Sequence, residues 1–329
     1  MIPAGRIRRL RIRILLLLLT SLSLSCGSTE FAGGGTGGTG ISTGAVSGYG
    51  SVVVNGVHFK TDNEVAPGFH TKKISNGSDK SRQMDRDVFS VGMVVTVRHG
   101  TADNNAQVIE YRRNLLGPVA KKFPGVDNVL EILGLSVVVD EPAKFDSLEP
   151  GDIVEVSGFA DNAGRIRAGY IFPVPPPMPP PFQEFDVKGF VSKSSSNRFH
   201  LGPLPDGSGL TVMVSYPPGG PANGTFVEVV TTDREPVGGV ITATRIEKLA
   251  SRTEFPDGTP VELEGLVTTP WSGSMNDFSF AVEGKRVQWD ANTEFVGGTR
   301  NDTQQTNRRV QVQGTETGGF LSAVRIVFR

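Results

Sequence analysis

The sequence predicts an all-β protein made of tandem small β-barrels, and three observations support this fold class. Glycine and proline are common, with 41 and 22 of 329 residues, which is typical of short strands joined by many turns. Runs rich in valine, isoleucine, phenylalanine and threonine alternate with a period of two, which indicates strands with one buried face. One pattern recurs four times along the chain, and no helical pattern exceeds two turns.

Residues 1–25 have the order of a secretory signal peptide. An apolar run over residues 14–24 follows five arginines that no acid accompanies (Arg6, Arg8, Arg9, Arg11, Arg13), and small residues come next. The apolar run is far shorter than the ~20 residues that a permanent transmembrane helix needs. This length disfavours the alternative of a short membrane anchor.

The only cysteine, Cys26, lies at the end of the apolar run and is the one candidate site residue. The sequence around it, Ser23-Leu24-Ser25-Cys26, resembles a bacterial lipobox, in which the cysteine is lipidated and becomes the new N-terminus. The pattern prefers leucine where this chain has Ser23, so ordinary secretory cleavage stays open as the alternative. A single cysteine excludes a disulfide framework and a cysteine-based zinc site. We predict lipid attachment at Cys26, with the membrane as a partner.

Residues 26–43 are rich in glycine, serine and threonine and predict a flexible tether. Two motif matches fall here. Gly33-x-Gly35-x-x-Gly38 imitates a dinucleotide fingerprint, and Gly40-x-Ser42-x-Gly44 imitates a nucleophile elbow. Neither has the flanking strand and helix that its chemistry requires, so both are interpreted as chance matches in the tether.

An internal repeat defines the organisation of the body. Four segments open with Gly-x-Val at intervals of 73, 72 and 76 residues (Gly44, Gly117, Gly189, Gly265). The same segments close with Ala-x-x-Ile (Ala106 to Ile109, Ala168 to Ile171, Ala243 to Ile246, Ala323 to Ile326). A turn residue also recurs three positions before a Val-x-Val strand (Gly92, Gly151, Gly224, Asn307). Asparagine replaces glycine where the chain needs positive φ.

Each copy holds about five short strands, which predicts a small, partly closed barrel of the OB kind. The predicted modules cover residues 44–113, 114–172, 186–249 and 265–329, with a proline-rich linker over 173–185 and a second linker over 250–264. The third copy departs from the pattern by an insertion over residues 203–207. Copies one and two are joined by seven residues and are expected to pack as a pair. The proline-rich linker is expected to separate two independently folding halves.

The segment from Gly48 to Phe59, together with the closing Gly-x-x-x-Ala-x-x-Ile, resembles a known family. It is similar to bacterial envelope lipoproteins built from the module called domain of unknown function 5666. The resemblance covers about residues 40–328. It implies tandem OB-like barrels in the cell envelope, and it brings no catalytic residues because none are established for the family.

The sequence contains few groups that could carry chemistry. The four histidines are not spaced as metal ligands and are interpreted as surface residues (His58, His70, His99, His200). No serine or threonine has a recognisable base partner. Three aspartates recur at one position of the repeat and are interpreted as turn caps rather than Ca²⁺ or sugar ligands (Asp62, Asp140, Asp290). Five aromatic residues are assigned to the cores rather than to base or sugar stacking (Tyr111, Trp271, Phe278, Phe280, Trp289).

The charge of the body argues against a nucleic-acid partner. Removing the five leader arginines from 33 basic residues leaves 28 against 34 acidic residues, a net charge of −6. The sequence therefore predicts a non-enzymatic lipoprotein of the cell envelope, more readily of the outer membrane than of the inner membrane, that presents barrels as a binding or scaffolding surface. Its partner is expected to be an envelope protein or a glycan, and no cofactor or metal is expected. The alternatives are a glycan-binding array and, third, an enzyme.

Overall fold

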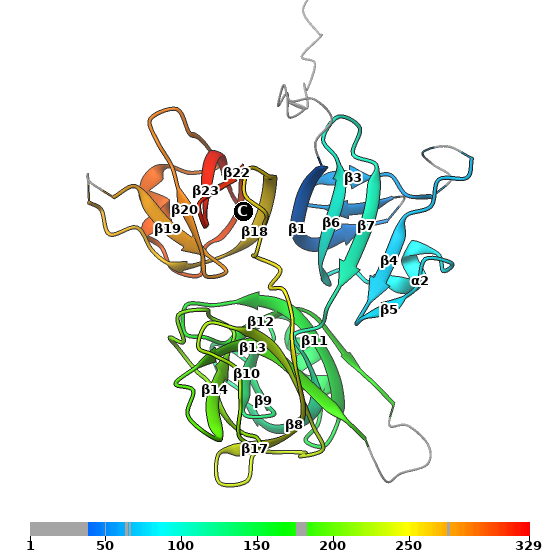
Figure 1. Ribbon diagram of the computed structural model, residues 1–329, viewed down its shortest axis with the longest axis vertical. Coiled ribbons are helices and arrows are strands. Elements are labelled where there is room, and N and C mark those ends of the chain that lie inside the picture. The colour runs from blue at the N-terminus through cyan, green and yellow to red at the C-terminus, as the bar shows by residue number, and fades with distance from the viewer. Residues whose placement is uncertain (1–38, 50, 63–64, 66, 176–182, 275–276) are drawn as a thin grey trace, which may run out of the picture. The chain divides into compact units, whose positions relative to one another are not determined.

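The computed structural model describes residues 39–49, 51–62, 65, 67–175, 183–274 and 277–329 (Figure 1). Strands make up 51% and helices 6%, so the predicted all-β class is confirmed. Residues 37–329 form one compact unit. The predicted signal peptide, Cys26 and most of the tether lie outside the described residues, as do residues 176–182 of the proline-rich linker.

Barrel 2 (residues 115–173) has the simplest closed circuit. Its five strands are β8 (Leu115–Phe123), β9 (Val129–Ile132), β10 (Leu135–Val138), β11 (Ile153–Ala160) and β12 (Ile166–Pro173). They pair in the order β8-β9-β10-β12-β11 and back to β8, and every pair is antiparallel except β10–β12. This is the strand order of an OB barrel, so the predicted architecture is confirmed here.

Barrel 3 (residues 185–248) repeats the circuit. Its strands are β13 (Phe185–Ser192), β14 (Arg198–Gly202), β15 (Val212–Ser215), β16 (Phe226–Thr231) and β17 (Val240–Lys248). They close in the order β13-β14-β15-β17-β16, again with one parallel pair, β15–β17.

Barrels 1 (residues 39–111) and 4 (residues 260–328) follow the same order with added strands. Barrel 1 contains β1 (Thr39–Gly48), β2 (Val52–Val54), β3 (Val57–Phe59), β6 (Val94–Gly100) and β7 (Ala106–Tyr111), plus β4 (Lys72–Ser75) and β5 (Ser78–Asp79). A parallel bridge between Lys60 and Asn105 completes its circuit. Barrel 4 contains β18 (Pro260–Thr269), β19 (Ser279–Val282), β20 (Lys285–Gln288), β22 (Arg309–Thr317) and β23 (Phe320–Phe328), and β21 (Glu294–Val296) joins β23.

Short helices lie between the third and fourth strands of three of these circuits. They are α2 (Asp85–Val88) in barrel 1, α3 (Pro142–Ser147) in barrel 2 and the 3₁₀ helix η2 (Arg300–Gln304) in barrel 4. Residues 216–225, which hold this position in barrel 3 and are all described, form no helix.

The repeat corresponds to fixed positions in the circuit. The valines of the Gly-x-Val openings lie in the first strands and are at most 1% exposed (Val46, Val119, Val191, Val267). The recurring turn residues all have positive φ, between 61° and 99° (Gly92, Gly151, Gly224, Asn307). The predicted backbone role of Asn307 is therefore confirmed, because this side chain tolerates the left-handed region.

Barrel 1 is joined to barrel 4, and barrel 2 to barrel 3, through their first strands. Barrels 1 and 2 also contact each other, as their short connection predicts, because the Val94 amide donates a 3.0 Å hydrogen bond to Ser157 Oγ. β1 runs parallel to β18, with Ile41 to Thr43 opposite Val261 to Leu263. β8 runs antiparallel to β13, with Leu115 opposite Val187. Both seams join a barrel on one side of the proline-rich linker to a barrel on the other side. The composition of the proline-rich linker predicted two independent halves. Strand pairing between the halves uses backbone groups, so the composition of the linker does not reveal it.

Three of the four joined strands begin before the predicted module boundaries, β13 by a single residue at Phe185. β1 starts at Thr39, inside the predicted tether, and β18 starts at Pro260, inside the predicted second linker. Two glycines of β1 leave room for side chains that lie over its face, since a methyl group at Gly44 would lie 2.0 Å from Asn55 Oδ1. A methyl group at Gly40 would lie 2.7 Å from the ring of His99.

The insertion of the third copy is a contact surface. Pro205 packs so closely against the β19–β20 turn that a methyl group at Gly284 would lie 2.2 Å from its Cδ. Just beyond the insertion, the Leu210 amide donates a 2.8 Å hydrogen bond to the Ala163 carbonyl of barrel 2. Residues that looked like an irregularity of the repeat thus connect barrel 3 to two neighbours.

Candidate functional site

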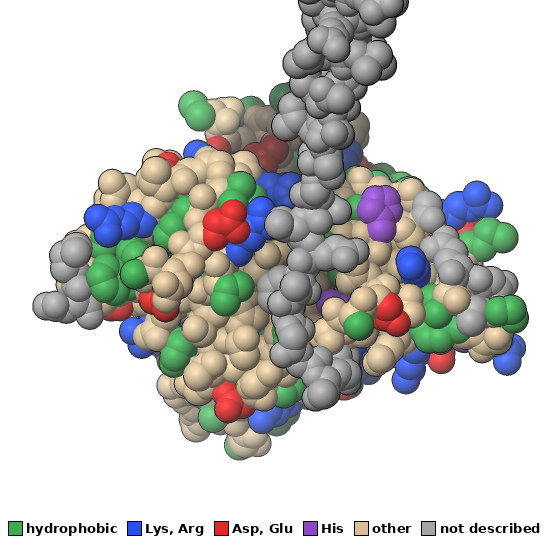
Figure 2. Space-filling model, turned by 90° about the horizontal axis from the view of Figure 1, so that it is seen from above, with side chains coloured by type: hydrophobic (Ala, Val, Ile, Leu, Met, Phe, Trp, Pro, Cys, Tyr) green, Lys and Arg blue, Asp and Glu red, His purple; other side chains and the backbone are tan. Residues whose placement is uncertain are grey.

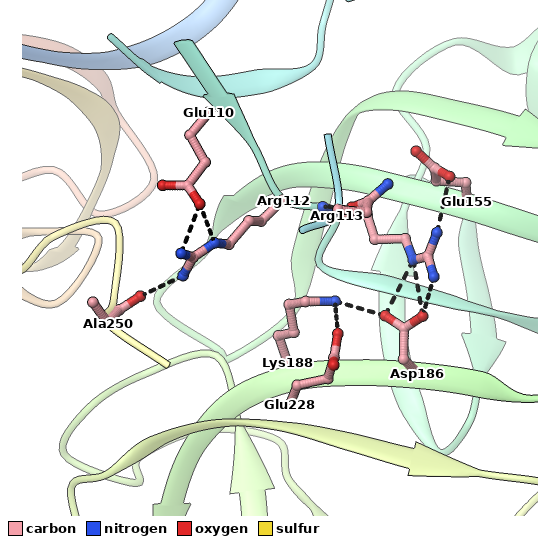
Figure 3. Close-up of polar contacts among 9 residues, drawn as sticks. Glu110, Arg112, Arg113, Glu155, Asp186, Lys188, Glu228 and Ala250 are labelled. Atoms are coloured by element: carbon pink, nitrogen blue, oxygen red, sulfur yellow. Dashed lines mark hydrogen bonds and ion pairs between the residues drawn. The ribbon is translucent and has the colours of Figure 1, made fainter. Parts of the chain in front are cut away.

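A network of charged side chains surrounds residues 112–114, the short connection between barrels 1 and 2 (Figure 3). The Arg113 guanidinium donates to both carboxylate oxygens of Asp186 on β13 and lies 3.4 Å from Glu155 on β11. The Lys188 ammonium lies 2.7 Å from Asp186 and 2.7 Å from Glu228 on β16. Arg112 binds Glu110 and donates to the Ala250 carbonyl at 3.0 Å. One connection is thereby held by three barrels and a linker.

The protonation states of this network suit a structural role. Burial acts to raise the pKa of Asp186, but the hydrogen bonds and charges of Arg113 and Lys188 outweigh it and hold that pKa below its usual value. Burial, reinforced by Glu155, raises the pKa of Tyr111, whose hydroxyl donates to Glu155 at 2.7 Å. Every charge in the network has an opposite charge in contact, which is the condition under which buried ions are tolerated. We find no group here poised to exchange a proton with a substrate.

A cavity of about 160 Å³ opens beside this network. Residues 250–255, which connect barrels 3 and 4, form one wall, and barrels 1 and 3 supply most of the rest. Arg252 fastens that wall, because its guanidinium donates to the Gly158 carbonyl at 2.7 Å and to Glu283 at 3.0 Å. Burial raises the pKa of Glu283, which also accepts a hydrogen bond from the Ala160 amide. Most cations around the cavity therefore already form ion pairs or hydrogen bonds within the protein.

The seam between β1 and β18 contains a serine and a histidine that sequence reasoning did not connect. Ser42 Oγ lies 3.1 Å from His99 Nε2 and 3.2 Å from Glu262 Oε2. His99 Nδ1 lies 2.9 Å from the Gly100 carbonyl, which can only accept, so Nδ1 carries a proton. Burial lowers the pKa of His99, which favours the neutral ring with a free electron pair on Nε2. The expectation that no serine has a base partner is therefore wrong for Ser42.

Ser42 nevertheless lacks the setting of a nucleophile. It lies within the extended strand β1, not at a strand–turn–helix elbow, and it is only 1% exposed. Two amides, Gln311 and Gln313, donate to Glu262 from the neighbouring strand β22. Ser42, His99 and Glu262 thus form part of a polar seam between two barrels. The signal that could have found them was the pairing of β1 with β6, which brings residue 42 opposite residue 97.

The remaining histidines lie apart from one another. His58 and His70 are exposed, and His200 is half-buried with its Nδ1 3.0 Å from Thr211. Among the described residues, no group of three or more His, Cys, Asp or Glu side chains could hold a metal ion.

The three recurring aspartates behave differently from one another. Asp290 caps its turn, since its carboxylate accepts the Asn292 amide at 2.8 Å, as predicted. Asp62 accepts the Thr71 amide at 3.1 Å and also pairs with the buried Lys73. Asp140 instead forms an exposed ion pair with Arg167, so turn capping is wrong for this copy.

Core packing is confirmed for the aromatic residues. Trp271 and Trp289 meet edge to face with ring centroids 5.3 Å apart, and Phe280 lies in the same core. Tyr111 is buried in the core of barrel 1, and Phe278 packs half-buried against Trp289. Among the residues that the structure describes, the exposed aromatic side chains are those of Tyr49, Phe123 and Phe172.

One face of the molecule carries hydrophobic side chains only in small groups, among polar and charged ones (Figure 2). Within the part of the chain that the structure describes, no helix is long and apolar enough to cross a membrane.

Comparison with known families supports the resemblance expected from the sequence. Two segments match the model of the family described as domain of unknown function DUF5666, residues 117–171 and residues 264–327. They correspond to barrels 2 and 4, so the family assignment is confirmed for these two segments. No curated protein matches the chain at a significant level.

Proposed function

We propose that this protein is a non-enzymatic lipoprotein of the cell envelope, anchored through Cys26, that presents its barrels as a scaffold for an envelope partner. The observation that carries the proposal is the position of β1, which begins at Thr39, inside the predicted tether, and is hydrogen-bonded on both sides, to β6 and to β18. A pull on the anchor would reach two barrels at once. This attachment suits a body that must stay fixed to a membrane.

The chemistry of the body supports a scaffold rather than an enzyme or a nucleic-acid binder. Three buried lysines each contact at least one carboxylate and therefore form structural ion pairs within the protein (Lys73, Lys188, Lys285). A net charge of −6 from residue 26 onward repels a phosphate backbone. The proposal places the protein more readily at the outer membrane than at the inner membrane, and it takes a protein or glycan of the envelope as the partner.

The anchor is tested by Cys26→Ser. We expect the wild-type chain to fractionate with membranes and to enter the detergent phase, and the variant to be recovered in the periplasm or medium. Labelling with a radioactive fatty acid should mark only the wild-type chain. Identical partitioning of the two chains would contradict lipid attachment and favour ordinary secretory cleavage.

Scaffolding is tested by chemical crosslinking of the anchored chain in intact cells, followed by binding measurements with the captured molecule. Repeated barrels raise avidity where the ligand is itself repeated. We compare the full chain with variants in which the binding surfaces of all barrels but one are mutated. We expect each of these variants to bind the captured molecule more weakly than the full chain. Turnover of a substrate that is lost on changing one polar residue would contradict the non-enzymatic function.

A glycan-binding array is the second candidate, and exposed aromatic residues favour it. Tyr49 follows β1 and is 47% exposed, and Phe123 ends β8 and is 48% exposed, so both lie at the first hairpin of their barrels. Exposed rings near the first hairpins of two barrels can stack on sugars. Co-sedimentation with insoluble peptidoglycan should fall in Tyr49→Ala/Phe123→Ala if this candidate is right.

A further inference from the structure

Barrel 3 lacks the short helix that the other circuits place between their third and fourth strands. In barrels 1, 2 and 4 that helix contributes a buried side chain, respectively Val88, Phe145 and Thr303. Residues 216–225 of barrel 3 include three prolines and three glycines and form no helix. Proline removes amide donors and glycine adds backbone entropy, so this sequence disfavours a helix here.

The missing helix leaves the core of barrel 3 partly uncovered. The closing isoleucine of the repeat is buried in the other circuits, at 0%, 7% and 0% exposure (Ile109, Ile171, Ile326), whereas Ile246 is only half-buried. Two residues further on, the other barrels have Tyr111, Pro173 and Phe328, and barrel 3 has the exposed Lys248. A groove of about 390 Å³ lies at this place.

The floor of the groove is apolar and its wall is stiff. Val227, Ala243 and Ile246 form the floor, and residues 216–221 form the wall. Gly220 packs against Tyr216 so closely that a methyl group would lie 1.8 Å from the ring. The Tyr216 hydroxyl in turn donates to the Ser195 carbonyl at 2.8 Å, which fixes the ring.

Two cations border this apolar floor. Arg245 and Lys248 line the groove on β17, both are exposed, and neither forms an ion pair with any residue that the structure describes. No acidic residue lines the groove, although Glu247 lies on the same face of β17 as Arg245. This differs from the buried lysines of the protein, which are paired with carboxylates.

We propose that this groove is the docking site for an acidic amphipathic helix of a partner protein. Three sister circuits hold a helical turn at the equivalent place, so a helix fits the geometry of this barrel end. The unpaired Arg245 and Lys248 are complementary to carboxylates on the polar face of such a helix, while its apolar face covers Ile246 and Ala243. The proposal deepens the proposed function by naming the kind of partner, and it rests on that function only in taking the partner to be a protein.

The test uses residues 27–329, which retain the whole compact unit of residues 37–329, and a fluorescein-labelled peptide. The peptide is an amphipathic helix of about 16 residues, long enough to be helical, with leucine and phenylalanine on one face and glutamate on the other. We expect saturable binding by fluorescence anisotropy, weakened roughly tenfold or more in Arg245→Glu/Lys248→Glu. The same peptide with lysine in place of glutamate should not bind the wild-type chain but should bind the variant.

The matched control is Lys60→Glu/Arg82→Glu, which changes the net charge equally at two exposed residues of barrel 1. It should bind the acidic peptide as the wild-type chain does. Absence of binding, or equal binding to both double variants, overturns the groove proposal. Binding of polygalacturonate but not of the peptide also overturns it and assigns the cations to an acidic glycan. Since no lipid anchor is present in this experiment, its failure is distinguishable from failure of the Cys26→Ser test.

Discussion

The two seams that join barrels through their first strands are built from different chemistry. Between barrels 2 and 3, β8 and β13 are antiparallel, and ion pairs of Arg113 and Lys188 with Asp186 flank them. Between barrels 1 and 4, β1 and β18 are parallel, and Ser42, His99, Gln311 and Glu262 meet in hydrogen bonds. Further along this second seam, Glu264 accepts the Ala45 amide.

The hydrophobic cores differ in the same way. The core residues of barrels 2 and 3 form one continuous cluster, whereas most core residues of barrels 1 and 4 lie in two clusters. Ile41 of β1 belongs to the barrel 4 cluster, and a small fourth cluster joins Ala45 of barrel 1 to Leu266 of barrel 4. The 2–3 seam therefore combines a shared core with paired charges, and the 1–4 seam combines strand pairing with polar side chains. The comparison teaches that first-strand pairing between barrels can be supported by ion pairs or by polar groups whose pKa values burial shifts.

The largest effect is expected from Asp186→Ala, which breaks the charged seam. Arg113 and Lys188 would remain buried without their shared carboxylate, and removing one partner of a buried ion pair costs about 3–5 kcal/mol. Urea unfolding of residues 27–329 measures the loss. The control is Asp140→Ala, which removes an exposed pair with Arg167 and should cost about 1 kcal/mol or less. Equal losses would show that the buried network contributes no more than a surface pair.

Gly92→Ala tests a third contact, which joins barrels 1 and 2 and belongs to neither seam. Gly92 and Gly151 hold the same turn of the repeat at φ values of +90° and +99°, so alanine strains both by roughly 1–2 kcal/mol. Only at Gly92 does a methyl group meet another barrel, 1.9 Å from the Gly169 carbonyl oxygen. We expect Gly92→Ala to lose about 1–3 kcal/mol more than Gly151→Ala in the same unfolding assay. If the two losses agree, barrels 1 and 2 do not need this contact.

The polar seam is tested by Glu262→Gln across a pH series. Burial raises the pKa of Glu262 above its ordinary value of 4.5. Its contribution to stability is thus full below pH 4.5 and is lost as pH rises through the raised pKa. The variant should be more stable than the wild-type chain at neutral pH and should lose this part of the pH dependence. Parallel pH curves, like those expected for the exposed Glu294→Gln, would contradict the assignment.

The smallest effect is expected from His99→Gln, on the acid side of the same seam. Burial lowers the pKa of His99 below 6.5, so its contribution is present above pH 6.5 and is lost as pH falls through the lowered pKa. The variant should flatten the stability curve as pH falls from neutrality through the lowered pKa of His99. The exposed His70→Gln serves as the control, and an identical response of both variants would argue against a buried neutral His99.

Much of each barrel could be predicted from the sequence because the repeated residues mark turns that need positive φ and strand positions that are buried. The positive φ of Asn307 and the burial of Val46 and Val267 follow from turn chemistry and from period-two alternation. The candidate sites could not be predicted in this way. Ser42 reaches His99 only because β1 pairs with β6, and Arg113 reaches Asp186 across 73 residues of sequence.

Sequence patterns settle strand order inside a barrel, since a short chain segment with alternating apolar residues has few ways to close a sheet. They do not settle which barrels join, because seams such as β1–β18 and β8–β13 are made by backbone hydrogen bonds that nearly every residue can form. The same reason applies to the groove of barrel 3. The prolines and glycines of residues 216–225 predict a loop, but only the packed barrel shows that this loop leaves Ile246 partly uncovered beside two unpaired cations.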